Sequence, residues 1–221
     1  MPNHQSKREL LRKKRADQKR RRIITGTLIV AGVIALFAVA ALLPRLLTKH
    51  NDIEQSEGFT VGNPEAPVHV VQFSSYTCGY CKNFSDNTEA DFIEEFVDPG
   101  KVYYRYVNLA SSNEKSVNAA IASYCAAEQN RFFEYKDFLY TYANAADGFS
   151  VENLTQYAAS ANMDVNQFQT CLEADTYANA YLDDCRYAQS VGVTGTPTFL
   201  VNGELYSASD LIPAVRAILG D

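Results

Sequence analysis

The residues best suited to chemistry are two cysteines, Cys78 and Cys81, which are separated by Gly79 and Tyr80. Residues 68–73 before the pair are rich in Val and typical of a buried strand, whereas residues 82–97 repeat apolar side chains near helical spacing. The pair is therefore expected where a strand leads into a helix, and unpaired N–H groups and the helix dipole there favour a thiolate. We predict that Cys78 is the attacking thiol and that Cys81 resolves a mixed disulfide with the substrate.

Other roles of a C-x-x-C pair fit this sequence less well. A zinc site usually takes four ligands, and the chain adds only His4, His50 and His69 to one such pair. Covalent haem attachment would need a histidine after the second cysteine, where Lys82 stands. Two methionines are few for a copper site. We expect no metal and no cofactor, with an inert structural disulfide, zinc and copper handling as the alternatives.

A proline near the end of the chain supports the redox interpretation. Residues 197–201 are typical of a strand, and the Asn202-Gly203 pair after them predicts a hairpin. A cis bond between Thr196 and Pro197 would leave the Thr196 backbone free to pair with an extended peptide. The ordinary alternative is a trans proline in a turn, because only about 5 to 6% of X-Pro bonds are cis.

The charge is divided unevenly along the chain. Residues 1–22 carry ten basic against two acidic side chains, while the remaining residues carry ten basic against 24 acidic ones. An acidic body argues against nucleic acid as a partner. Residues 23–43 contain no charge and, as a helix of about 31 Å, would span a bilayer. We predict a cytoplasmic basic tail, a single-pass membrane anchor and an extracytoplasmic catalytic domain, in an oxidising compartment.

A cleaved signal peptide is the alternative to the anchor, since Ala38-Val39-Ala40 resembles a cleavage site. We favour the anchor, because the apolar run is longer than a usual signal core of roughly 7 to 15 residues. Residues 44–60 are mostly polar and are expected to be a linker to one folded domain, residues 61–221.

Within that domain, residues 101–109 are typical of a second strand, so strand, helix and strand predict a βαβ unit with a parallel pair. An all-helical insertion is expected at about residues 110–190, with Ser209 as the N-cap of a final helix. The helical stretches predicted in the insertion lie near residues 114–128, 131–144, 150–161 and 164–190.

Residues 73–81 and 192–199, with the helical segment between them, resemble the DsbA-like branch of the thioredoxin superfamily over roughly residues 60–220. The resemblance implies an α/β class: a thioredoxin fold with an inserted all-helical domain. The N-terminal transmembrane helix predicted from residues 23–43 precedes this domain. The resemblance also implies that Cys78 is the nucleophile, that Cys81 is the resolving thiol and that Pro197 is cis. Thr196, Pro197 and Tyr80 are then expected to bind the substrate.

Two features depart from the family pattern. Many relatives carry an acidic residue six positions before the first cysteine, where this chain has Gln72, which cannot titrate. Proton transfer at the resolving cysteine must therefore use water or another group. The Gly79-Tyr80 dipeptide and Thr196 resemble the disulfide isomerases, but residues 44–60 are too short for the separate dimerisation domain of those proteins.

Three further cysteines, Cys125, Cys171 and Cys185, lie in the predicted insertion. Similar exported proteins carry a disulfide in this region, and that likeness favours a structural Cys125–Cys171 bond. One straight helix would place Cys171 and Cys185 about 21 Å apart, too far for a bond, although a break near Ala174-Asp175 would permit it. Three buried free thiols are the remaining alternative.

These features predict a protein thiol-disulfide oxidoreductase whose partners are exported proteins with thiols or disulfides. We expect net oxidation, with recharging by a membrane redox partner. Isomerisation or reduction of wrong disulfides is the first alternative. A non-catalytic module that holds a metal or an unfolded client is the second.

Overall fold

The computed structural model describes residues 57–110 and 114–221. The elements in chain order are η1 (Glu57–Phe59), β1 (Thr60–Val61), β2 (Val68–Ser74), α2 (Gly79–Phe84), η2 (Ser85–Glu89), α3 (Ala90–Phe92), η3 (Ile93–Val97), β3 (Val102–Asn108), α4 (Glu114–Glu128), α5 (Phe132–Tyr142), α6 (Val151–Ser160), α7 (Val165–Glu173), α8 (Ala178–Ser190), β4 (Thr198–Val201), β5 (Glu204–Tyr206) and α9 (Leu211–Leu219).

The five strands form one mixed sheet in the order β1-β3-β2-β4-β5. The central pair, β2 and β3, is parallel, so the predicted βαβ unit is confirmed. β4 runs antiparallel to β2 and pairs with β5 through the expected hairpin. Asn202 and Gly203 both have positive φ, at 46° and 95°, as a two-residue hairpin turn with the strand twist requires.

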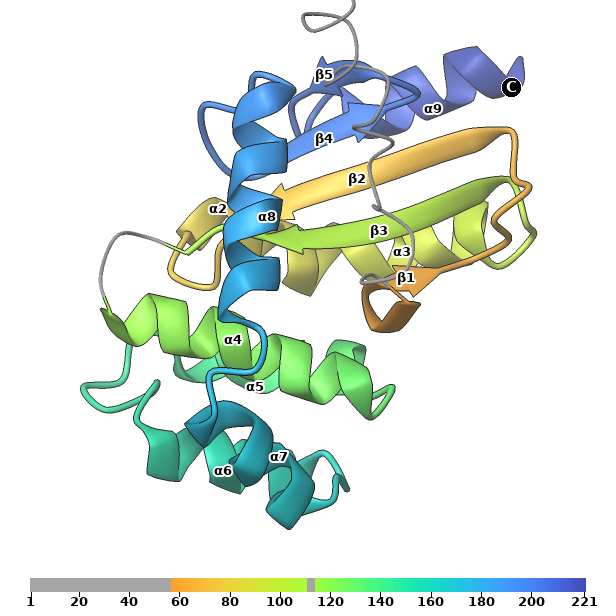
Figure 1. The fold of residues 1–221 in the computed structure, drawn as a ribbon. Helices are drawn as coiled ribbons and strands as arrows, with labels where there is room; N and C mark the ends of the chain where they lie inside the picture. Colours follow the sequence, from red (N-terminus) through yellow and green to blue (C-terminus); the bar gives the residue numbers. More distant parts are fainter. Residues whose placement is uncertain (1–56, 111–113) are drawn as a thin grey trace, which may run out of the picture. The chain divides into compact units, whose positions relative to one another are not determined.

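Helices cover both faces of this sheet. α2 and α3 lie behind β2 and β3, and α8 crosses in front of them (Figure 1). Because side chains alternate along a strand, Val68 and Val70 of β2 pack with the apolar side chains of α2, α3 and α9. Phe73, on the opposite face, packs with Ala188 of α8. The sheet is therefore buried on both sides, which fixes the strand that leads to the cysteine pair.

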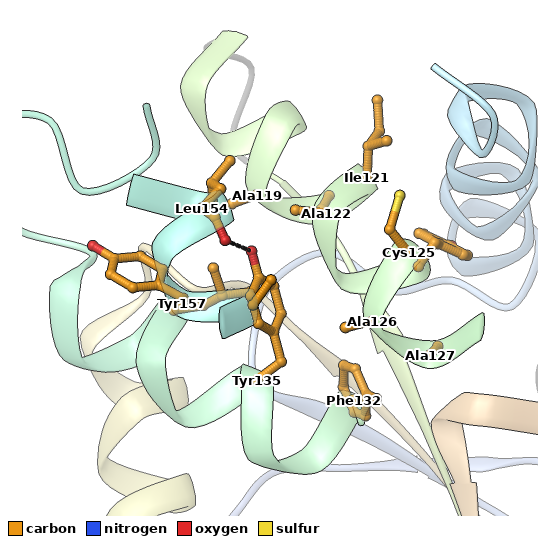
Figure 2. Close-up of a cluster of buried hydrophobic side chains, with 14 of the residues drawn as sticks. Ala119, Ile121, Ala122, Cys125, Ala126, Ala127, Phe132, Tyr135, Leu154 and Tyr157 are labelled. Carbon is orange, nitrogen blue, oxygen red and sulfur yellow. Dashed lines mark hydrogen bonds between the residues drawn. The ribbon is translucent and has the colours of Figure 1, made fainter. Parts of the chain in front are cut away.

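Between β3 and β4 the chain is helical, as predicted, from α4 to α8. α4 presents a face of small residues, among them Ala119, Ala122 and Ala126, to the core of this helical part (Figure 2). The hydroxyl of Tyr135 donates to the backbone carbonyl of Leu154 at 3.0 Å and joins α5 to α6 (Figure 2). The small alanine side chains let neighbouring helices approach closely, which suits the Ala-rich composition of this stretch.

Two boundaries differ from the sequence predictions. The helical stretch predicted near residues 164–190 is divided into α7 and α8, because Asp175 adopts a left-handed conformation with φ of 49°. α9 has Asp210 at its N-cap, so the expectation of Ser209 there was wrong. The hydroxyl of Ser207 donates its hydrogen to Asp210 at 2.5 Å, so it accepts the hydrogen bond that joins it to the hydroxyl of Ser209 at 2.8 Å.

Cys125 of α4 and Cys171 of α7 form a disulfide with their Cα atoms 5.9 Å apart. This is the pairing that the family resemblance implies. The break at Asp175 exists, yet Cys185 is a free thiol, so the alternative Cys171–Cys185 pairing and the alternative of three free thiols do not describe this structure.

We expect the double change Cys125→Ala and Cys171→Ala to lower the free energy of unfolding by about 4 kcal/mol, because the bond closes a long loop in the unfolded chain. The sequence separation of the two cysteines is 46 residues. Urea unfolding of the oxidised protein measures this loss. Cys185→Ala is the control and should change stability by less than about 1 kcal/mol; equal losses in both variants would contradict the assignment.

Across residues 57–110 and 114–221, none of the helices has the length and apolar character that crossing a bilayer requires. The predicted tail at residues 1–22, the predicted anchor at 23–43 and most of the predicted linker at 44–60 lie outside the described residues.

Candidate active site

The cysteine pair lies where β2 leads into α2. Cys78 is the N-cap residue of α2, with extended backbone angles of φ −89° and ψ 118°. Its carbonyl accepts the N–H of Lys82 at 3.0 Å, the first bond of the helix. The Cys78 side chain is half-buried, whereas Cys81, one turn further on, is fully buried. The side chain of Cys78, the predicted attacking thiol, is thus partly open to solvent, whereas the side chain of Cys81 is not.

The cis peptide bond Thr196-Pro197 lies beside the pair. The thiol of Cys78 is 3.2 Å from the backbone carbonyl oxygen of Thr196 and donates a hydrogen bond to it. Cys78, Thr196 and Gly195 line the same surface depression. The structure therefore brings together two segments that are more than a hundred residues apart in the chain.

The pKa of Cys78 is set by opposing effects. Partial burial is the largest of them and raises the pKa, because it disfavours a charged sulfur. Hydrogen bonds act against burial: the backbone N–H of Cys81 and the side chain of Thr196 contribute most, followed by the side chain of Cys81 and the N–H of Tyr80. Together they outweigh burial, so the pKa of Cys78 lies below its ordinary value. Donors at the start of α2 thus favour the thiolate there.

The pKa of Cys81 moves the other way. Burial raises it to about 11, although a hydrogen bond with the side chain of Ser74 acts in the opposite direction. Cys81 is therefore a protonated thiol at neutral pH, whereas the lowered pKa of Cys78 favours its thiolate. This separation is the one expected if Cys78 attacks and Cys81 resolves the mixed disulfide.

These directions predict the pH dependence of thiol alkylation. A lowered pKa means that the Cys78 thiolate is present below the ordinary thiol pKa of about 8.5, so its alkylation rate should reach its plateau at a lower pH than that of a model thiol. Cys81 should stay unreactive until the pH approaches about 11. Mass spectrometry of iodoacetamide-treated peptides separates the two sites. A Cys78 rate that still rises steeply above pH 9 would contradict the assignment.

Tyr80 extends away from the pair and is 81% exposed. It lines a groove with Asn83, Phe84 and Pro197, on the other side of the cis bond from the Thr196 depression. An exposed aromatic ring next to a backbone segment that can pair with a peptide is suited to hold an unfolded chain. Of the predicted substrate residues, Thr196 thus lies beside the sulfur of Cys78, and Tyr80 and Pro197 line the groove.

A set of buried polar residues beneath the cysteines was not predicted from the sequence. We call it the buried polar network, and its members are Gln72, Ser74, Glu89, Tyr104, Lys136 and Tyr140, all 4% exposed or less. Lys136 and Glu89 form its ion pair, with 2.6 Å between Nζ and Oε2. One signal was present: Lys136 lies four residues from Phe132 and from Tyr140, on the apolar face of its helix.

A family model described as thioredoxin matches residues 54–221. The Na(+)/H(+) antiporter NhaA 1 of Mycobacterium sp. (strain KMS) is 27% identical over 177 residues, and the match covers 77% of this chain but 28% of the antiporter. The chain thus spans less than a third of that relative. A Rickettsia prowazekii protein whose name proposes protein-disulfide oxidoreductase activity is 24% identical, with 73% of this chain and 61% of that protein covered.

Among solved structures, oxidised BdbD from Bacillus subtilis has a TM-score of 0.68 at 22% identity, covering 76% of this chain and 95% of BdbD. This likeness shows the mixed α/β thioredoxin fold with its helical insertion. The strand order, the position of the cysteine pair and the cis proline all fit this fold. Since the matching family model extends over most of the sequence, the chain belongs to the thioredoxin family.

Proposed function

We propose that this chain is a thiol-disulfide oxidoreductase that exchanges disulfides with protein substrates through Cys78 and Cys81. The observation that carries the proposal is the thiol of Cys78 at the start of α2, with a lowered pKa and 3.2 Å from the carbonyl of Thr196 at the cis proline. In the oxidising direction a substrate thiolate attacks the sulfur of Cys78 and releases Cys81. A second substrate thiol then forms the substrate disulfide and releases Cys78 as a thiolate.

Net oxidation of exported proteins is the direction we favour. A thiolate that is stabilised by helix donors makes the reduced form more stable, and this gives an oxidising pair. The apolar stretch at residues 23–43, after a basic tail, supports a domain tethered outside the cytoplasm, where a membrane redox partner would restore the disulfide. The Cys125–Cys171 bond supports the same compartment.

The test is an exchange assay with two substrates. A reduced, unfolded protein with several cysteines should be oxidised by the disulfide form of the full chain, at a rate that scales with the concentration of the full chain.

Isomerisation is the second candidate function, favoured by Gly79-Tyr80 and Thr196. A scrambled, fully oxidised substrate that regains activity without net oxidation would select it. Lack of exchange with either substrate would refute the proposed function.

The proposed location has its own measurement. A membrane-impermeant maleimide added to intact cells should label Cys78, since this thiol is half-exposed in the described domain. Labelling that requires cell lysis would contradict an extracytoplasmic domain.

A further inference from the structure

The resolving cysteine must gain or lose a proton in each half of the exchange. When a substrate thiolate opens the Cys78–Cys81 disulfide, the new bond joins the substrate sulfur to Cys78, and Cys81 leaves as a thiolate that takes one proton from water. The reverse step returns that proton to water, and the Cys81 sulfur displaces the substrate. Thiols that are better stabilised as thiolates leave faster. Groups that donate hydrogen bonds to the Cys81 sulfur therefore control this step.

Among the groups that lower the pKa of Cys81, the side chain of Ser74 has the largest effect. Its hydroxyl hydrogen-bonds the Cys81 sulfur and lowers the pKa of that thiol against the effect of burial. Ser74 has a single hydrogen to donate. Its oxygen accepts a bond from Nε2 of Gln72 at 3.2 Å and lies 2.8 Å from the hydroxyl of Tyr140. When both neighbours donate to Ser74, its hydrogen is left for Cys81.

Gln72 can donate to Ser74 only while its amide is oriented with the nitrogen toward Ser74. The hydroxyl of Tyr104 donates to Oε1 of Gln72 and fixes that orientation. The same hydroxyl lies 3.1 Å from Oε1 of Glu89. Because Tyr104 has one hydrogen and two acceptors, the Glu89 carboxylate competes with Gln72 for it.

Glu89 is held in place from several sides. Its Oε2 accepts bonds from Lys136 at 2.6 Å and from Ser85 at 2.9 Å. It lies in the π-helical turn η2, a distortion that often marks a functional site in a helix. Burial and the charge of Glu89 both raise the pKa of Tyr104 well above its ordinary value, so Tyr104 keeps its hydrogen. The competition for that hydrogen is therefore permanent at physiological pH.

We propose that Glu89 is a positioning residue for Cys81, acting through Tyr104 and the Gln72 amide on the hydrogen bond that Ser74 donates to the resolving sulfur. Glu89 is the buried acid of this network, and it is paired with Lys136 of α5. The charge on Glu89 weakens the orientation of Gln72. It thereby keeps Cys81 a poor thiolate and slows its departure.

Other titratable groups lie near Glu89 or Cys81, and they must be considered when Cys81 is titrated. They are Tyr104 and Tyr106 on β3, Lys136, Asp137 and Tyr140 on α5, Tyr76 between β2 and α2, and Cys78 at the start of α2. Burial raises the pKa values of Tyr106 and Tyr140 well above their ordinary values. Their hydroxyls therefore stay protonated while Cys81 titrates.

The test measures the pKa of Cys81 from the Cβ chemical shift of labelled cysteine in the full chain, with Cys78→Ser present so that one thiol of the pair titrates. The paired change Glu89→Gln with Lys136→Met removes the ion pair without leaving a buried charge. The new amide can donate to Tyr104, which frees the tyrosine hydrogen for Gln72. We expect the pKa of Cys81 to fall by about 1, a tenfold gain in thiolate at a given pH.

Tyr104→Phe is the second arm. In this background the paired change should leave the pKa of Cys81 unaltered, because the connection to Gln72 is gone. Equal shifts with and without the tyrosine hydroxyl, or no shift at all, would overturn the proposal. Glu94→Gln is the matched control, an exposed carboxylate on the same helical run, and should have no effect.

If the paired variant fails to fold, Gln72→Met decides the question, because it removes the amide and keeps Glu89. The pKa of Cys81 should then rise, and an unchanged value would overturn the proposal. The proposal rests on the proposed exchange function for its role in turnover. The titration needs no substrate, so its failure is distinguishable from a failure of the exchange assay.

Discussion

Replacing Cys78 by serine should lower the rate of disulfide exchange by roughly a thousandfold or more, the scale of loss when a catalytic nucleophile is removed. The physical reason is that a serine hydroxyl is not ionised near neutral pH and cannot form a disulfide. The donors around position 78 would then stabilise no charge. The measurement is the rate of oxidation of a reduced protein substrate by the full chain.

Cys185→Ser is the matched control for this change. Cys185 is also a half-buried free thiol, but burial raises its pKa, so little of it is ionised at neutral pH. We expect this variant to keep the wild-type exchange rate. A Cys78→Ser protein that still exchanges disulfides at the wild-type rate would refute the nucleophile assignment.

Replacing Cys81 by serine should trap substrates instead of abolishing attack. Helix donors and the side chain of Thr196 still lower the pKa of Cys78, so this thiolate still attacks a disulfide of the substrate and forms a mixed disulfide, releasing the other substrate sulfur as a thiolate. The serine hydroxyl cannot displace the bound substrate, and the release of that substrate should slow by on the order of a hundredfold or more, leaving escape to external thiols.

The trapped complexes are measured on non-reducing gels and by mass spectrometry of the Cys78 peptide. They should disappear on addition of dithiothreitol and be absent when Cys78 is also replaced. A Cys81→Ser variant that forms no adduct while wild type turns over would show that Cys81 has a role in the first attack.

The local parts of the fold were predictable because each carries its own pattern. The β-branched run before Cys78, the helical spacing after it and the Asn202-Gly203 turn each specify an element from neighbouring residues. The bounds of α4, Glu114–Glu128, agree with the stretch predicted near residues 114–128. The parallel pairing of β2 and β3 followed from the helix between them.

The site was predictable only where a motif is local. The cysteine pair could be placed at the start of a helix, but neighbouring residues alone favoured a trans bond before Pro197, and the cis form was implied by the family resemblance. The ion pair of Lys136 and Glu89 joins residues 47 positions apart. A charged side chain on a helix is usually solvated, so nothing local indicated its burial.

The break between α7 and α8 has a similar cause. A left-handed conformation at a non-glycine residue such as Asp175 is uncommon and is stabilised by its surroundings, so the helical pattern of residues 164–190 continued past it. The start of α9 at Asp210 was also missed, and there the side chain of Asp210 accepts a hydrogen bond from Ser207.

The most direct measurement is the redox equilibrium of the full chain in glutathione buffers of defined ratio, with free thiols alkylated and the peptides mapped. We predict a reversible disulfide that joins Cys78 to Cys81, with a potential nearer to about −120 mV, typical of an oxidant, than to about −270 mV, typical of a reductant. Both thiols staying free across this range, or pairing of either one with Cys185 instead, would contradict it.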